Sequence, residues 1–286
     1  MPSNSGRRAA VCGKPIVHSL SPVVHAAGFA ATGLLDWTYT AMECAESELA
    51  DRVASLGPEW AGLSLTMPLK EAALTVAAAA SPVAVATGAA NTLVRRDDGT
   101  WFADNTDVPG MVRVLRDAGV AGGSSHQQQG VPSVAVLGGG GTARAALAAA
   151  AELGAAEVTV VTRRREALAE LAPAAAALGV TIVGMGWPDA AAAFGADAVI
   201  STVPKGAADH LALQVHWRPG TVLFDAIYDP WPTPLAASAI THGVRVVSGL
   251  DLLLAQAIGQ FELFTGISPA PEAAMREALL AAAAVR

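Results

Sequence analysis

Apolar and polar positions in the first 107 residues alternate between helical and strand-like periods. Segments 25–34, 46–57 and 70–80 carry apolar residues at helical spacing and predict three helices, the last ending before Ser81-Pro82. Segments 37–44 and 60–68 are typical of strands, the second of them fully buried. This pattern predicts an α/β module in which helices and strands follow one another along the chain.

Residues 91–105 continue the module as two short apolar runs separated by Asp98-Gly99, a turn signal that predicts a hairpin-like pair. The stretch 119–132, rich in Gly, Ser and Gln, then marks a change in composition. We interpret it as a flexible surface connection. The simplest interpretation is an inserted loop without a function of its own.

The second half of the chain opens with a strand–helix–strand unit. An apolar strand, Val134–Leu137, leads directly into four glycines, a helix over Thr142–Leu153 and a second apolar strand, Val158–Val161. Three further strands are predicted at 181–185, 197–202 and 221–228. This βαβαβ order predicts a Rossmann-type, doubly wound parallel sheet.

The last apolar segment, 249–266, predicts an amphipathic helix that begins at Gly249 and ends at Gly266. A further C-terminal helix needs a surface to pack on, and the incomplete first module offers one. We therefore expect two α/β domains with a cleft between them. Residues 1–107 plus 249–286 would form a substrate-binding and catalytic domain, and residues 108–248 a dinucleotide-binding domain.

Composition excludes several classes of protein. Of the 286 residues, 52% are hydrophobic and 15% charged, which excludes disorder of the whole chain. The net charge of -7 favours neither nucleic acid nor an anionic membrane, so a small molecule is the expected partner. We expect the protein itself to be a monomer or a homodimer. Neither Cys12 nor Cys44 has metal or disulfide spacing. No apolar segment resembles a signal peptide or a membrane span, so we expect a cytoplasmic protein.

The glycine run carries the first functional signal. Gly138 to Ala143, with Gly139, Gly140, Gly141 and Thr142 between them, matches the G-x-G-x-x-A dinucleotide fingerprint, and it follows a strand and opens a helix as that motif requires. Gly138 would permit the tight turn, and Gly140 would let backbone N–H groups approach a pyrophosphate at the helix N-terminus. A glycine turn without a ligand is the alternative.

The end of the second strand selects between NAD and NADP. NAD sites place an acidic residue there, whereas this chain has Thr162 followed by Arg163, Arg164 and Arg165. Guanidinium groups suit the 2′-phosphate of NADP, so we expect NADP as the cofactor. The alternative is a solvated basic face at the start of a helix.

Polar residues cluster in the loops of the first module and on the last long helix. They are Thr66, Lys70, Asn91, Asp104, Asn105, Asp107 and Gln256. An alcohol dehydrogenase needs a group that takes the hydroxyl proton as hydride leaves, and Lys70 with Asp107 is the best candidate pair. An exposed lysine at a helix start is the plainer interpretation of Lys70. Calcium or magnesium would need more oxygen ligands at fixed spacing, so no metal is expected.

The chain resembles the shikimate dehydrogenase family over its whole length and in the right order. The resemblance rests on eight motifs: GKPIVHSLSPVVH, LTMPLK, GAANT, DNTD, GGGGTAR, STVPKG, DAIYDPWPTPL and GLDLLLAQA. It implies NADP-linked interconversion of 3-dehydroshikimate and shikimate, in the biosynthesis of chorismate and the aromatic amino acids.

The resemblance also implies a role for each matching residue. Lys70 would exchange the proton and Asp107 would bind the reacting hydroxyl beside it. Ser19 and Ser21 would bind the substrate carboxylate. Thr66, Asn91 and Gln256 would bind ring hydroxyls or the carboxylate side of the substrate. Tyr228 would add a hydroxyl at the substrate edge. Thr202, Val203 and Gly249 would line the cofactor, with Gly249 touching the nicotinamide through its backbone.

A nucleophilic role is an alternative for Ser19 and Ser21. No G-x-S-x-G elbow surrounds either serine, so hydrolase chemistry is not expected. On an extended segment the two side chains would point the same way and converge on one anion. His18 and His25, in the same motif, are expected to be structural.

The sequence departs from the family pattern at two positions. Ala26 and Ser64 stand where the family often has Asn. These replacements put the pocket shape in doubt, and with it the discrimination between shikimate and quinate. A quinate/shikimate dehydrogenase of broader substrate or NAD use, and a catalytically silent NADP-binding paralogue, are the alternatives.

Overall fold

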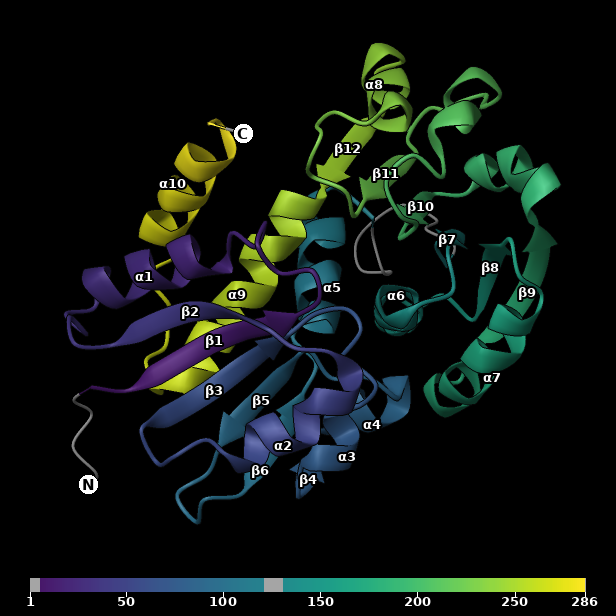
Figure 1. The fold of residues 1–286 in the computed structure, drawn as a ribbon. Coiled ribbons are helices and arrows are strands. Elements are labelled where there is room, and N and C mark those ends of the chain that lie inside the picture. Colours follow the sequence, from purple (N-terminus) through teal and green to yellow (C-terminus); the bar gives the residue numbers. More distant parts are fainter. Residues whose placement is uncertain (1–5, 121–130, 286) are drawn as a thin grey trace. The chain divides into compact units, whose positions relative to one another are not determined.

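The computed structural model describes residues 6–120 and 131–285, and the chain divides into two compact units (Figure 1). Unit 1 comprises Met1–Thr106 and Leu253–Arg286, and unit 2 comprises Asp107–Leu252. The Gly- and Gln-rich connection predicted from the sequence lies largely outside the described residues. Each unit contains one six-stranded sheet, so the predicted α/β fold class is confirmed.

Unit 1 is built on a mixed sheet with the strand order β2-β1-β3-β5-β6-β4. The β1–β2, β1–β3 and β4–β6 pairs are parallel, whereas β5 runs antiparallel to both of its neighbours. The strands are β1 (Arg8–Gly13), β2 (Thr38–Glu43), β3 (Trp60–Leu65), β4 (Ala79–Ala80), β5 (Thr92–Arg95) and β6 (Trp101–Asp104). The predicted hairpin over 91–105 is the β5–β6 pair.

Helices cover both faces of the unit 1 sheet (Figure 1). Phe29 of α1 packs against Phe261 of α9 on one face, and the Cβ position of Gly28 is in contact with both α9 and α10. Leu49, Ala73 and Ala84 belong to the core of the other face. The helices are α1 (Ser21–Ala31), η1 (Glu46–Glu48), α2 (Leu49–Ala54), α3 (Ala73–Val76), α4 (Pro82–Thr87), α9 (Gly249–Thr265) and α10 (Glu272–Ala283).

The helix predicted over 70–80 is wrong in extent. Only α3 is helical there, and Ala79–Ala80 form the edge strand β4. The Ala78 N–H donates to the Trp101 carbonyl and the Ser81 N–H to the Ala103 carbonyl, so pairing with β6 overrides the helical propensity of alanine. Ser81 begins the next helix instead, because its hydroxyl accepts the Ala84 N–H as an N-cap.

Unit 2 has a fully parallel sheet with the strand order β12-β11-β10-β7-β8-β9, the doubly wound order of dinucleotide-binding folds. The predicted Rossmann-type sheet is therefore confirmed. The strands are β7 (Val134–Leu137), β8 (Glu157–Thr162), β9 (Thr181–Gly186), β10 (Ala198–Ser201), β11 (Val222–Asp225) and β12 (Arg245–Ser248). The helices are α5 (Asp107–Asp117), α6 (Gly141–Glu152), α7 (Glu166–Leu178), η2 (Trp187–Gly195), η3 (Asp209–Leu213) and α8 (Pro234–Thr241).

Alternate residues of each central strand in unit 2 enter different cores. Val134 and Val136 of β7 pack with α5, α6 and α7, whereas Ala135 and Leu137 pack with η2, η3 and α8. Both sides of the strand are thus buried, which accounts for its continuous apolar sequence. Because both sides of these strands are buried, polar residues can reach solvent at the strand ends.

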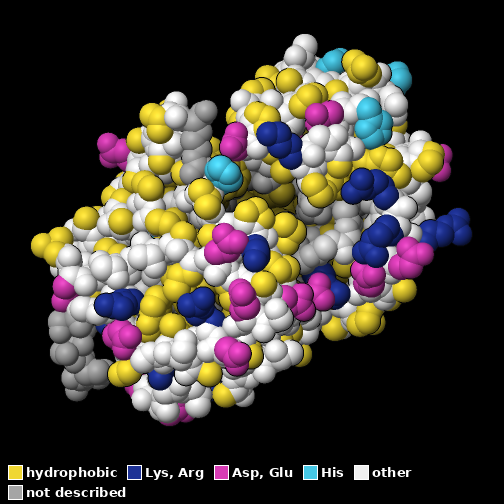
Figure 2. Space-filling view, viewed as in Figure 1, with side chains coloured by type: hydrophobic (Ala, Val, Ile, Leu, Met, Phe, Trp, Pro, Cys, Tyr) yellow, Lys and Arg dark blue, Asp and Glu magenta, His cyan; other side chains and the backbone are white. Residues whose placement is uncertain are grey.

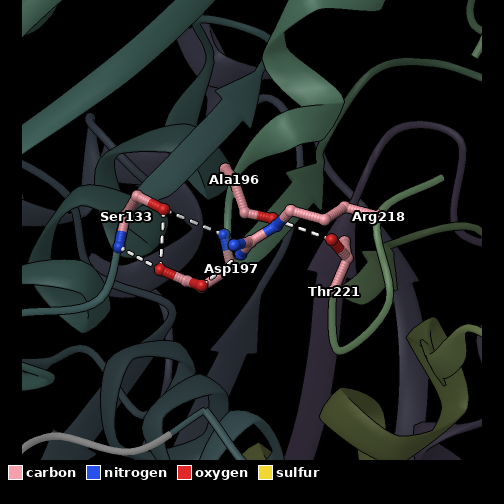
Figure 3. A network of polar contacts seen from close by, with 5 residues as sticks. All are labelled: Ser133, Ala196, Asp197, Arg218 and Thr221. Carbon is pink, nitrogen blue, oxygen red and sulfur yellow. Dashed lines mark hydrogen bonds and ion pairs between the residues drawn. The ribbon is translucent and has the colours of Figure 1, made fainter. Parts of the chain in front are cut away.

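A polar network closes the N-terminal end of this sheet (Figure 3). One carboxylate oxygen of Asp197 accepts the backbone N–H and the hydroxyl of Ser133, at 2.8 and 2.7 Å, and the other accepts from Arg218. Alongside, Thr221 donates its hydroxyl to the Ala196 carbonyl at 2.9 Å. The network ties together the segments that enter β7, β10 and β11.

Cys12 and Cys44 are both buried and free, as expected from their spacing. Burial raises the pKa of the Cys12 thiol to about 12, so it stays protonated at neutral pH. Within the described ranges, no helix combines the length and apolar character needed to cross a membrane.

Candidate functional site

The glycine run follows β7 and opens α6, as the sequence predicts. Gly138 has φ +119°, and a Cβ there would collide with the Thr202 hydroxyl. A Cβ on Gly139 would lie 2.7 Å from the Cβ of Ala167, whereas a Cβ on Gly140 would point into open space. Gly140 is also the N-cap of α6 and provides no side-chain cap. The first N–H groups of α6 thus end at an open glycine loop, a geometry that fits a pyrophosphate.

Thr202 and Val203 follow the neighbouring strand β10. The N–H and hydroxyl of Thr202 both donate to the Leu137 carbonyl, at 2.8 and 2.9 Å, which fixes this residue beside Gly138. The side chain of Val203 is buried in the core that faces α8. Thr202 is therefore positioned to line the glycine loop, and any cofactor contact of Val203 would fall to its backbone.

The three arginines at the end of β8 are all exposed, but they differ in their partners. Arg164 binds the carboxylate of Glu170 through two hydrogen bonds of 3.1 and 3.2 Å, which raise its pKa. Arg163 makes no hydrogen bond or ion pair within the described part of the chain. Figure 2 shows basic and acidic side chains interspersed over the region of β8, β9 and α7. Within the same described residues the Arg165 side chain is unpaired as well, so Arg163 and Arg165, rather than Arg164, are available to an added phosphate.

Tyr228 and Gly249 lie together in unit 2. The buried Asp225, at the end of β11, accepts the Ile227 N–H at 3.2 Å and the Thr233 hydroxyl at 2.7 Å, which shapes the loop that carries Tyr228. A Cβ on Gly249 would collide with the Ala226 carbonyl and lie 3.1 Å from the Tyr228 ring. Only glycine fits at the start of α9 with this loop in place.

Ser19 and Ser21 are close in space, but not for the reason expected. The segment is not extended there, because the Ser19 N–H donates to the Ile16 carbonyl and Leu20 has helical dihedral angles. Instead, the Ser21 N–H donates to the Ser19 hydroxyl oxygen at 3.3 Å, where α1 begins. The predicted alternation along a strand is wrong, and a helix-entry turn brings the two serines together.

Thr66 and Lys70 occupy the turn that follows β3. The Thr66 N–H donates to the Cys12 carbonyl at 2.9 Å, and a Cβ on Gly13 would collide with the Thr66 methyl group. The Lys70 carbonyl accepts the Ala90 N–H at 2.7 Å, which joins this turn to the segment that carries Asn91. Lys70 is half-buried and lies two residues before Ala72, the N-cap of α3.

Asn91 is buried at the centre of a hydrogen-bond network in unit 1. Its Oδ1 accepts the Thr106 N–H and the Thr92 hydroxyl, both at 2.8 Å. Its Nδ2 donates to the Thr106 hydroxyl at 3.0 Å and faces the Oε1 of Gln256 at 3.4 Å. Gln256 is held in turn by a 2.8 Å hydrogen bond from its Nε2 to the Leu253 carbonyl. The structure thus brings two of the predicted substrate-binding residues together.

The DNTD stretch divides between the two units. Asp104 accepts the Ser81 hydroxyl at 2.6 Å and Asn105 donates to the Ala89 carbonyl at 2.9 Å, so both residues shape the local fold of unit 1. Asp107 is buried at the first position of α5 and belongs to unit 2, whereas Lys70 belongs to unit 1. Over the described residues, no group of three metal-binding side chains was found.

Sequence reasoning missed Gln260, a buried polar residue one helical turn after Gln256. Its Oε1 accepts the Ser64 hydroxyl at 2.6 Å, and its Nε2 donates to the Asn91 carbonyl and the Thr92 hydroxyl, each at 3.1 Å. The i, i+4 spacing of two glutamines on one helix was the available signal. Their contacts are separated by more than 160 residues in the chain, which single-segment patterns do not reveal.

Comparison with known proteins assigns the chain to a family. Residues 11–93 match the model of the shikimate dehydrogenase substrate binding domain, and residues 249–280 match that of the shikimate 5′-dehydrogenase C-terminal domain. Residues 133–227 match a model described as NADP oxidoreductase, coenzyme F420-dependent. The family models therefore cover parts of both structural units.

Relatives match over nearly the whole chain. Shikimate dehydrogenase (NADP(+)) of Caulobacter vibrioides is 37% identical over 93% of this chain and 92% of its own length. The protein of the same name from Anaeromyxobacter dehalogenans is 38% identical over 96% and 97%. The crystal structure of Mycobacterium tuberculosis shikimate dehydrogenase, 45% identical, covers 96% of this chain and 99% of its own with a TM-score of 0.84. The chain therefore belongs to the shikimate dehydrogenase family.

Proposed function

We propose that this chain catalyses the reversible, NADP(H)-linked interconversion of 3-dehydroshikimate and shikimate. The observation that carries the proposal is the near full-length agreement with relatives named shikimate dehydrogenase (NADP(+)). A related structure from Thermus thermophilus, 29% identical with a TM-score of 0.80, is described as a complex with NADP(H) and shikimate. We expect the enzyme to act in the cytoplasm.

The proposed proton transfer rests on Lys70 and Asp107. In the oxidation of shikimate, the amine of Lys70 takes the proton of the reacting hydroxyl, and the carboxylate of Asp107 stabilises the ammonium that forms. In the reduction of 3-dehydroshikimate, the ammonium of Lys70 returns the proton to the carbonyl oxygen. NADP(H), when bound, supplies or accepts the hydride.

Substrate recognition in unit 1 follows from the fixed direction of two side-chain amides. The Nδ2 of Asn91 is a hydrogen-bond donor and the Oε1 of Gln256 is an acceptor, and these two atoms face each other at 3.4 Å. A ring hydroxyl satisfies both groups, since it accepts one hydrogen bond and donates another, whereas a carboxylate only accepts. We therefore assign Asn91 and Gln256 to a ring hydroxyl. Thr66 is assigned to the same ring.

The substrate carboxylate is assigned to Ser19 and Ser21. Their hydroxyl groups lie at a helix entry where the Ser21 N–H is already engaged, so the hydroxyls rather than backbone groups would donate to the anion. Tyr228, beside Gly249 in unit 2, is assigned to the substrate edge that meets the nicotinamide.

Cofactor binding is assigned to the open glycine loop, to Thr162 at the end of β8 and to the exposed arginines. Residues Gly138–Ala143 fit the pyrophosphate, because Gly140 leaves room and the N-terminus of α6 lacks a side-chain cap. Arg163 fits the 2′-phosphate, and Arg164 would join it by leaving Glu170. Thr202 forms the wall beside the loop.

The test is a set of initial rates that crosses shikimate and quinate with NADP and NAD. We expect fast turnover only with shikimate and NADP. Comparable turnover with quinate or NAD would make this a quinate/shikimate dehydrogenase of broader use. Absence of turnover in all four combinations, with NADP binding retained, would identify a silent NADP-binding paralogue.

A further inference from the structure

Gln260 lies behind the candidate substrate-binding residues of unit 1. It is 1% exposed, and both ends of its side-chain amide are engaged. A buried amide with every partner in place is costly to disturb, because each lost partner leaves a polar group unsatisfied. Its place on α9, four residues after Gln256, puts both glutamines on one side of the helix.

Backbone groups fix the direction of each hydrogen bond around Gln260. The Asn91 carbonyl can only accept, so the Gln260 atom 3.1 Å from it is Nε2. The Oε1 must then face Ser64, and the Ser64 hydroxyl at 2.6 Å must donate to it. Ser64 is left with an acceptor, which takes the Tyr39 hydroxyl proton at 2.6 Å.

The same direction continues from Gln260 to Asn91. The second Nε2 proton of Gln260 goes to the Thr92 oxygen, so the Thr92 hydroxyl donates its own proton to the Asn91 Oδ1 at 2.8 Å. The Thr106 N–H reaches the same Oδ1. The Nδ2 of Asn91 is thereby turned toward Gln256 as a donor.

We propose that Gln260 is a positioning residue for substrate recognition: together with Ser64, it holds Asn91 with its side-chain N–H directed at the substrate ring. The inference deepens the proposed function and rests on it. Ser64 stands where the family often has Asn, and it serves here as the link between Tyr39 and Gln260. The pair Ser64–Gln260 thus supports Asn91 from β3 and α9.

The test measures steady-state kinetics of Gln260→Met, Ser64→Ala and the double variant with shikimate and NADP. Methionine fills the volume of glutamine but donates no hydrogen bond. We expect Gln260→Met to raise KM for shikimate about tenfold, while kcat and KM for NADP stay within threefold. Ser64→Ala should raise it less, and the double variant no more than Gln260→Met, because both changes break one network.

Two controls separate positioning from stability. Phe261→Leu alters the buried neighbour of Gln260 on α9 and should lower the melting temperature without changing KM for shikimate. Ser55→Ala removes an exposed hydroxyl of unit 1 and should change neither. KM does not depend on how much of the enzyme is active, so partial unfolding of a variant cannot imitate the effect.

A KM for shikimate unchanged in Gln260→Met, or additive effects in the double variant, would overturn the inference while the proposed function stands. The wild-type rate is read first. A wild-type protein that does not oxidise shikimate would overturn the proposed function and the inference together.

Discussion

In unit 1 the proposed substrate-binding residue Asn91 is buried in a network of hydrogen bonds, whereas in unit 2 the arginines proposed to bind the cofactor are exposed. Asn91 is 2% exposed, and its Oδ1 accepts the backbone N–H of Thr106, which fixes the orientation of its side-chain amide. Arg163 lies at the surface, and the loop at Gly140 is open. Folding therefore builds Asn91 into the core, so that changes at this residue affect the stability of the fold and the proposed recognition of substrate together.

The largest expected effect concerns Lys70, the one cationic side chain assigned to the substrate groups of unit 1. Lys70→Ala removes the proposed proton carrier and should lower kcat about a thousandfold, while shikimate binding measured by calorimetry changes only a few-fold. Lys14→Ala, an exposed lysine of the same unit, should leave kcat unchanged. More than a tenth of the wild-type kcat in Lys70→Ala would remove Lys70 from the mechanism.

Asn91→Ala tests the coupling of stability and recognition directly. It leaves the buried Thr106 N–H and Thr92 hydroxyl without their acceptor, so we expect a loss of about 2 to 3 kcal/mol in the free energy of unfolding and a raised KM for shikimate. Urea titration and steady-state kinetics measure the two effects.

Asn105→Ala is the matched control, because Asn105 is equally buried but bonds to the Ala89 carbonyl. It should lower stability and leave KM for shikimate near the wild-type value. Equal kinetic effects in both variants would mean that stability alone explains the result.

His25 is a buried group of unit 1 that should make the stability of the fold depend on pH. The ring is fully buried, stacks on Tyr39 at 4.1 Å between ring centroids, and makes no hydrogen bond through either nitrogen within the described residues. Burial lowers the pKa of His25 to about 3, although the nearby Gln260 amide opposes the change. The expectation that His25 is a packing residue fits this environment.

The unfolded chain therefore takes up a proton at His25 below about pH 6.5, where the folded protein does not. Stability from this group is lost as the pH falls, by about 2 kcal/mol between pH 7 and pH 5. His25→Phe should remove that part of the pH dependence in urea titrations, and His242→Ala, an exposed histidine of unit 2, should retain it. Identical slopes for His25→Phe and wild type would contradict the assignment.

The smallest expected effect belongs to the exposed groups of unit 2. Arg163→Ala should leave the melting temperature unchanged and lower the preference for NADP over NAD, expressed as a ratio of kcat/KM values, about tenfold. Rising salt should reduce the difference between variant and wild type, because exposed charges are screened. Arg276→Ala, an exposed arginine of unit 1, serves as control. An unchanged preference in Arg163→Ala would place the 2′-phosphate elsewhere.

The sequence predicted features that depend on neighbouring residues. The strand Val134–Leu137 and the glycines after it identify a βαβ unit because double burial demands an unbroken apolar run and the turn demands glycine. Prediction failed where distant segments decide the outcome. Ala79–Ala80 form a strand because β6 offers partners. The error at Ser19 and Ser21 is of another kind, because the helix entry that Leu20 and Pro22 shape is a local turn that was not recognised.

The candidate site divides in the same way. Motifs identify Asn91 and Gln256 through the family resemblance, but Gln260 and Ser64 come together across 196 positions. Their hydrogen bond depends on the packing of α9 against β3 and β5, which no local pattern contains. The departure at Ser64 was visible in the sequence, whereas its hydrogen bond to Gln260 was not.

The hydrogen bonds of Asp197 fix the position at which β7 enters the sheet of unit 2. Ser133 is held to Asp197 by its own N–H and hydroxyl, and its carbonyl accepts the N–H groups of Asp197 and Ala198. The alignment of β7 with β10 is thus set one residue before Val134, so loss of the Ser133 hydrogen bonds would loosen both strands at the same point.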